Sequence, residues 1–162
     1  MIKRIHNISK IYTWNTSYNS LEVLEGKDII LNEGIIQEII DKNSKNCEVN
    51  IDAEDTIITP GFIDSHTHPI FFGNRSKEYI SRLNGISYDE IKKAGGGIIS
   101  SIEKTRSSSF EDLFEYSYKK NIIPFTKYGT TTLEAKSGYG LSLKDEIKSL
   151  EIIKKIKNII DI

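Results

Sequence analysis

Residues 60–68 read Pro60-Gly61-Phe62-Ile63-Asp64-Ser65-His66-Thr67-His68. The apolar start and polar end predict a short buried strand, and the Pro-Gly pair marks the break before it. Alternate side chains of a strand point to one face, so Asp64, His66 and His68 are expected to project together. Two imidazoles at this spacing can bind one metal ion, and imidazole suits zinc and related metals. The alternative is a strand that carries two histidines at its exposed end by chance.

Two histidines do not complete a catalytic metal site. Catalytic zinc normally takes three protein ligands and leaves one position open. The third histidine, His6, lies in a different part of the chain and is expected to be structural. Cys47 also lies outside this strand, in the part of the chain that precedes it. The remaining ligands and the catalytic acid–base residues are therefore expected beyond Ile162.

Residues 1–59 are expected to form a small β module. Two β-branched runs, residues 28–31 and 35–40, flank the short loop Asn32-Glu33-Gly34. This pattern predicts a hairpin whose turn has one residue at positive φ. A further extended stretch is expected over residues 48–58.

Residues 60–162 change to a pattern of strands and helices. Helical periodicity is expected over 77–83, 88–93 and 98–106, and Ser109 is a suitable cap for the next helix, which Pro124 should kink or end. A strand is expected over 130–135. On the last helix one apolar stripe is expected, made of Leu143, Ile147, Leu150, Ile153 (or its neighbour Ile152) and Ile156. The order strand, helices, strand, helix predicts parallel βα units.

The last helix is expected to run to Ile159, Ile160 and Ile162 without a stop signal. Two βα units do not close a sheet, and a (β/α)8 barrel takes about 250 residues. We therefore expect this chain to be the N-terminal piece of a longer protein.

Composition excludes several classes of protein. The chain has 162 residues, a net charge of −1, 38% hydrophobic and 28% charged residues, which is typical of a globular protein rather than a disordered one. The balanced charge indicates neither a nucleic acid partner nor a membrane partner. The single cysteine, Cys47, fits a reducing compartment, so a cytoplasmic location is expected. A transit peptide in the basic segment 1–14 is the less favoured alternative.

The stretch 57–141 resembles the amidohydrolase superfamily and, within it, the imidazolonepropionase family. The His-Thr-His strand marks the superfamily. Three further segments mark the family: Ile70-Phe71-Phe72-Gly73-Asn74-Arg75, Ala94-Gly95-Gly96-Gly97-Ile98 and Lys136-Ser137-Gly138-Tyr139-Gly140-Leu141. The resemblance implies an α/β fold: the first part of a metal-dependent (β/α)8 barrel hydrolase, preceded by part of a composite β-sandwich. It further implies hydrolysis of 4-imidazolone-5-propanoate to N-formimidoyl-L-glutamate in histidine degradation, and suggests a homodimer.

The resemblance also implies roles for single residues. His66 and His68 match two ligands of a zinc or iron ion, and Arg75 and Tyr139 match residues that bind the substrate. A guanidinium offers two parallel donors to a carboxylate such as the propanoate group. The structural alternatives are a surface ion pair of Arg75 with Glu78 or Asp89, and a Tyr139 ring that is simply packed on a glycine loop.

Other residues are weaker candidates. Glu134 and Lys136 are expected to share a face of their strand and to form an ion pair near the site. The amides of Gly95-Gly96-Gly97 precede a helix and could receive an anion, and Asp64 is expected to support the strand rather than bind the metal.

Two other functions stay open. One is a different amidohydrolase, such as a purine or pyrimidine deaminase. The other is a non-catalytic metal-binding module. On the favoured hypothesis the isolated piece exposes apolar surface and has no activity of its own.

Overall fold

The structure is a computed structural model, and it describes residues 1–159. The chain divides into two compact units, Met1–Pro60 and a second unit that begins at Gly61. No helix within the described residues is both long and apolar enough to cross a membrane.

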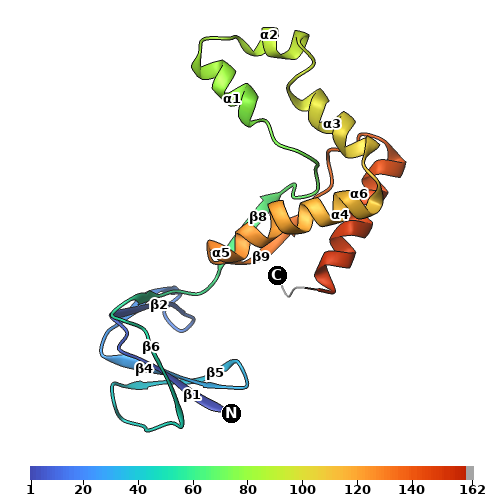
Figure 1. Cartoon of the computed structure of the whole chain (residues 1–162). Coiled ribbons are helices and arrows are strands. Elements are labelled where there is room, and N and C mark those ends of the chain that lie inside the picture. The colour runs from blue at the N-terminus through green and yellow to red at the C-terminus, as the bar shows by residue number, and fades with distance from the viewer. Residues whose placement is uncertain (160–162) are drawn as a thin grey trace. The chain divides into compact units, whose positions relative to one another are not determined.

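The first unit consists of β-strands and turns (Figure 1). One sheet has the order β5-β4-β1-β6 and the other has the order β3-β2-β7. Ile8, Ile11 and Ile29 form its buried centre. The strands are β1 (Ile2–His6), β2 (Lys10–Asn15), β3 (Ser20–Leu24), β4 (Lys27–Asn32), β5 (Ile35–Asp41), β6 (Val49–Asp52) and β7 (Ile57–Ile58).

The predicted hairpin is present as the antiparallel pair β4–β5. Its turn differs in one respect, because both Glu33 (φ 52°) and Gly34 (φ 85°) have positive φ. Two such residues are typical of a type I′ turn, whose twist matches that of the flanking strands.

The extended stretch expected over residues 48–58 is interrupted. It forms two short strands, β6 and β7, which belong to different sheets. Between them Glu54 and Asp55 both have positive φ. The Glu54 amide donates to Asp52 Oδ1 at 2.8 Å, an Asx-type turn that ends β6.

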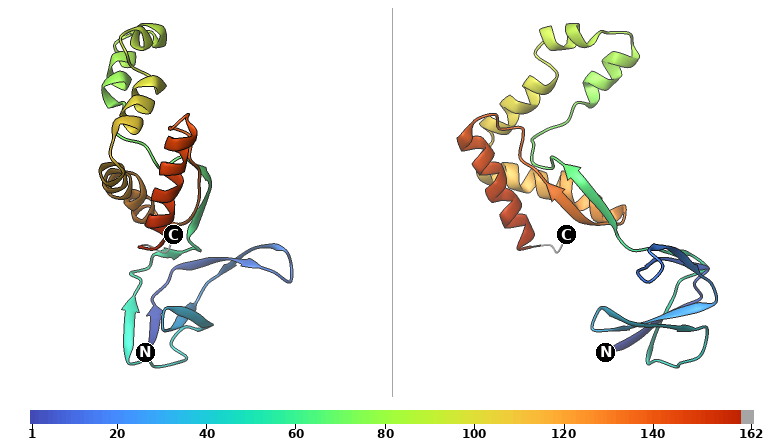
Figure 2. Two further views of the ribbon diagram at one scale, coloured as in Figure 1. Left: turned by 90° about the vertical axis from the view of Figure 1, so that its right-hand side faces the viewer. Right: turned by 180° about the vertical axis from the view of Figure 1, so that it is seen from behind.

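The second unit contains a parallel pair of strands, β8 (Phe62–Thr67) and β9 (Thr130–Ala135). Gly61 is needed where the two strands meet, because a Cβ atom there would lie 2.1 Å from Thr131 Oγ1. The helices are α1 (Ser76–Leu83), α2 (Tyr88–Lys93), α3 (Ile98–Ser107), α4 (Phe110–Tyr116), α5 (Ile123–Lys127) and α6 (Leu143–Lys157). α1 and α2 form an arm that extends away from β8 and β9 in every view (Figures 1 and 2).

The region around Pro124 differs from the prediction. Ser109 caps α4 as expected, accepting from the Asp112 amide at 3.0 Å. The chain then remains helical past Pro124, through a π-helix η1 (Ser117–Ile122) and then α5. Pro124 lies in the first turn of α5, where a missing N–H is tolerated, and the wider π-turn comes just before it.

The core of the second unit lies where the helices pack behind β8 and β9. Its buried residues are Ile70, Leu113, Phe114, Ile122, Ile152 and Ile156. The stripe predicted on α6 is correct for Ile156 and for the alternative Ile152, and Ile153 is partly buried against the same core. It is wrong for Leu143, Ile147 and Leu150, which are exposed. α6 turns Ser149, Ile152 and Ile156 toward α4, and this tertiary contact rather than the apolar pattern selects the buried face.

α6 also ends earlier than predicted. Its last residue is Lys157, and Asn158 is the C-cap. Asn is a common helix stop, so the sequence carried a signal that the prediction overlooked. Ile160 and Ile162 lie outside the described residues.

Candidate active site

The two histidines of the His-Thr-His stretch lie next to each other at the end of β8. Their ring centroids are 5.1 Å apart and their planes are inclined by 75°. His66 is exposed, whereas His68, just after the strand, is half-buried. Asp64 supports the strand, because its Oδ1 accepts from the His66 amide at 3.1 Å. The structure therefore places two imidazoles side by side and directs the Asp64 carboxylate to the backbone.

The loop after β9 holds the His68 ring. Lys136 N donates to Thr67 O at 2.8 Å, and His68 Nδ1 lies 2.8 Å from Ser137 O. A carbonyl oxygen only accepts, so this hydrogen bond requires the proton on Nδ1 and leaves the Nε2 lone pair available. Metal-binding histidines commonly donate their other ring N–H to a carbonyl in this way.

Tyr139 belongs to the same cluster. Its ring meets His68 edge to face, with centroids 6.3 Å apart, and it also contacts Phe71 at 5.4 Å. The structure thus brings together three of the four residues that the sequence singled out: His66, His68 and Tyr139.

Two charged residues that sequence reasoning missed, Glu146 and Arg106, anchor the loop after β9. Glu146 Oε1 accepts from the amides of Gly140 (2.9 Å) and Leu141 (2.7 Å). Arg106 Nε donates to Gly140 O at 2.5 Å, and Arg106 lies 3.8 Å from Asp145. In the sequence Glu146 looks like an ordinary acidic residue in the first turn of a helix, so no local signal separates it from its neighbours.

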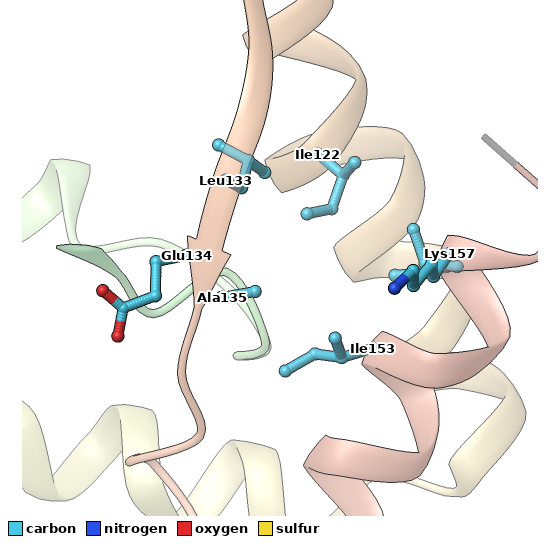
Figure 3. A pocket seen from close by; sticks show the side chains of 7 residues that line it. Ile122, Leu133, Glu134, Ala135, Ile153 and Lys157 are labelled. Carbon is cyan, nitrogen blue, oxygen red and sulfur yellow. The ribbon is translucent and has the colours of Figure 1, made fainter. Parts of the chain in front are cut away.

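Glu134 and Lys136 form the predicted ion pair. The hydrogen bond and charge of Lys136 lower the pKa of the Glu134 carboxyl, with a smaller contribution from His66. Leu133 and Ala135 line an apolar hollow with Ile122 and Ile153, whereas Glu134 points away from it (Figure 3). None of the four predicted site residues lines this hollow.

Arg75 lies apart from the cluster, at the residue before α1. It is exposed and lines a polar hollow with Asn74, Ser76, Lys77, Glu78 and Lys104. Within residues 1–159 no salt bridge joins Arg75 to Glu78 or Asp89. The surface ion pair considered as an alternative is therefore not formed.

The Gly95-Gly96-Gly97 loop does not present a free anion site at Gly97. Its amide at the start of α3 donates to Glu78 Oε1 at 3.0 Å. An internal carboxylate thus occupies the place that the sequence suggested for a bound anion.

The histidine pair suits a metal ion but does not enclose one. Both side chains offer nitrogen donors of the kind that zinc takes, and the hydrogen bond to Ser137 orients His68 with Nε2 free. Between residues 1 and 159, no group of three or more His, Cys, Asp or Glu side chains is arranged to hold a metal.

Solved structures share the fold of this chain. The guanine deaminase of C. acetobutylicum superposes with a TM-score of 0.55 at 17% identity, covering 96% of this chain and 34% of the deaminase. An uncharacterized metal-dependent hydrolase of Pyrococcus horikoshii gives a TM-score of 0.54 at 14% identity, with coverages of 98% and 46%. These likenesses establish a mixed α/β fold of the kind found in amidohydrolase structures.

Curated relatives are closer in sequence, although no family model matches the chain. An imidazolonepropionase of Thermoplasma volcanium is 40% identical over 96% of this chain and 40% of its own length. One from Clostridium tetani is 37% identical, with coverages of 94% and 39%. One from Geobacillus kaustophilus is 51% identical over 65% of this chain. The chain spans about two fifths of the length of the first two relatives. Over nearly its whole length the chain is similar in sequence to imidazolonepropionases, as the motifs predicted.

Proposed function

We propose that the protein containing this chain is a metal-dependent hydrolase that converts 4-imidazolone-5-propanoate to N-formimidoyl-L-glutamate. The observation that carries the proposal is the 40% identity to an imidazolonepropionase over 96% of the chain. The paired imidazoles beside Tyr139 support it. A deaminase has only the shared fold in its favour, at 17% identity.

His66 and His68 are the residues of this chain that would hold a zinc or iron ion. When bound, such a metal supplies Lewis-acid activation of water and polarises the ring carbonyl. Ser137 O keeps the His68 proton on Nδ1, which directs Nε2 to the ligand role. Further ligands and the acid–base residues would come from sequence beyond Ile162.

Tyr139 and Arg75 are the proposed substrate-binding residues. Tyr139 is half-buried beside His68, so its ring can bound the substrate next to the metal ligands. Arg75 lines a hollow together with Lys77, Lys104 and Glu78, where the positive charges outnumber the single negative one and suit a carboxylate. Holding the propanoate would orient the ring for attack by water.

The finer architecture belongs to the same proposal. Residues 1–59 would be part of a composite β-sandwich, and residues 60–162 would be the first βα units of a (β/α)8 barrel. A homodimer and a cytoplasmic location complete the proposal, the latter resting on the lone Cys47. By itself, this piece is expected to be inactive.

The test is turnover of 4-imidazolone-5-propanoate by the full-length protein loaded with zinc or iron. Formimidoylglutamate should form, and guanine should not be deaminated; the reverse result would overturn the assignment. Arg75→Ala should raise KM far more for the propanoate substrate than for an imidazolone without the carboxylate. Lys93→Ala removes an exposed positive charge from α2 and is the matched control. Equal KM effects on both substrates would remove Arg75 from the binding site.

A further inference from the structure

The loop of residues 137–140 fits closely against His68. A Cβ atom at Gly138 would lie 2.6 Å from His68 Nδ1 and 2.8 Å from Cε1. Together with the Ser137 carbonyl and the Tyr139 ring, this contact surrounds one side of the imidazole. The position of the ring therefore depends on the position of the loop.

The same loop fits closely against the start of α6. A Cβ atom at Gly140 would lie 2.7 Å from both the Asp145 carbonyl carbon and the Glu146 nitrogen. Gly140 is buried, and its N–H and C=O are both paired with side chains, those of Glu146 and Arg106. A displacement of this helix end would thus be transmitted through the loop to His68.

Glu146 is the residue that joins α6 to the loop. One carboxylate oxygen, Oε1, accepts hydrogen bonds from the backbone amides of Gly140 and Leu141. The other, Oε2, is buried and receives no hydrogen bond of normal geometry from residues 1–159. Burial disfavours the charge of Glu146, but the Ser137 hydroxyl, the two amides and the charge interaction with His68 together more than offset this, so the pKa of Glu146 is lowered. A half-buried carboxylate whose one oxygen accepts from two consecutive backbone amides is a specific anchor for the loop that carries those amides.

We propose that Glu146 is a positioning residue, which holds loop 137–140 so that His68 and Tyr139 keep their orientation in the site. The effect on catalysis rests on the proposed function, whereas the effects on loop protection and on metal affinity do not require turnover. Glu146 makes no hydrogen bond to His66, His68 or Tyr139 among the described residues, so its hydrogen bonds act on the site through the loop. Its charge also interacts with His68 directly, and this interaction contributes to the lowered pKa of Glu146.

The experiment compares Glu146→Ala and Glu146→Gln in the full-length protein with Glu151→Ala, which removes an exposed carboxylate from the same helix. Hydrogen exchange of the peptide covering Gly140 and Leu141 reports on the loop. Chelator competition gives the zinc Kd, and steady-state kinetics give kcat and KM. Glu146→Ala should speed exchange in this peptide at least about tenfold and weaken zinc about 10–100-fold, the usual effect of losing an outer-shell partner.

Rescue separates positioning from general destabilisation. Glu146→Gln keeps an acceptor oxygen for the two amides, so it should retain most of the loop protection and zinc affinity, and Glu151→Ala should equal the wild type. If Glu146→Ala does not fold, Glu146→Asp is measured instead: it keeps the charge but is one methylene too short to reach both amides, and it should resemble the expected Ala variant. Unchanged loop exchange, or a loosened loop with unchanged zinc affinity, would overturn the proposal. If the wild type fails to turn over the imidazolone, the proposed function fails while these two measurements still decide the role of Glu146.

Discussion

The two segments that carry predicted substrate-binding residues are built differently. Loop 137–140, which carries Tyr139, is tied by hydrogen bonds to His68 just after β8, 69 positions away, and to Arg106 of α3, 34 positions away. A third bond ties it to Glu146 at the start of α6, six positions away. The α1–α2 arm, which follows Arg75, is held mostly by local bonds such as the capping box of Ser87 and Glu90. Among the described residues its longest-range hydrogen bond runs from the Gly97 amide to Glu78, 19 positions apart, and remains within the arm and the start of α3.

The difference indicates where this chain is preorganised. The histidines and Tyr139 have their positions set by three separate elements, as expected of a site that must hold a metal in one geometry. Arg75 has its position set by one short helix. We therefore expect changes in the loop to affect metal binding and changes in the arm to leave it unaltered.

The largest effect is expected from His68→Ala. Removing a proposed ligand should weaken zinc by more than about 100-fold, above the usual range for an outer-shell partner. Chelator competition on the full-length protein measures the Kd. His6→Ala, in the first unit, is the control and should bind zinc normally; an equal loss in both variants would contradict the site.

A smaller effect is expected from Gly138→Ala. The new methyl group would collide with the His68 ring, so the ring must move and its hydrogen bond to Ser137 is lost. We expect zinc to bind about 10–100-fold more weakly. Gly85→Ala is the matched control: its φ is +86°, but its Cβ would meet nothing within 4 Å. If Gly85→Ala weakens zinc as much as Gly138→Ala does, backbone strain rather than contact with His68 is the cause.

The smallest effects are expected from removing two similar N-caps, one on α6 and one on α2. Ser142 Oγ accepts from Asp145 N at 3.2 Å, and Ser87 Oγ accepts from Glu90 N at 3.3 Å. Each Ser→Ala substitution should cost about 1 kcal/mol in the free energy of unfolding. Hydrogen exchange should increase at Gly140 and Leu141 only in Ser142→Ala. An equal increase in Ser87→Ala would show that the arm and the loop are coupled.

The Ser142 variant also has a pH signature. The hydrogen bond with Ser142 is the largest cause of the lowered pKa of Asp145. Burial is the next largest influence and raises the pKa, whereas the hydrogen bond and charge of Lys148 and the charge of Arg106 lower it further. A lowered carboxyl pKa stabilises the fold above the unfolded value, about 3.9, and this stabilisation is lost as the pH falls. Removing Ser142 raises the pKa of Asp145 toward that value. Thermal unfolding between pH 6 and 3 should therefore show less acid-dependent loss of stability in Ser142→Ala than in the wild type; an identical pH dependence would contradict this.

Local patterns were sufficient for most of the secondary structure. The hairpin β4–β5, the strand before His68 and the cap at Ser109 all follow from residues within a few positions of one another. Errors arose where a tertiary contact or an overlooked turn overrode the pattern. The buried face of α6 is one case, because α4 covers Ile152 and Ile156 while Ile147 and Leu150 stay exposed.

The site likewise has one part that the sequence predicts and another that only the tertiary structure decides. That His66 and His68 lie side by side depends on the two-residue repeat of one strand, a property of the backbone that any reader of the sequence can apply. The hydrogen bond from His68 to Ser137 spans 69 positions. The anchoring of that loop by Arg106, 34 positions away, likewise exists only after α3 has packed beside the loop, whereas Glu146 lies only six positions from Gly140. The sequence positions of an imidazole and a guanidinium do not reveal their hydrogen-bond partners. Hydrogen bonds depend on the distance and direction between two groups in the folded chain.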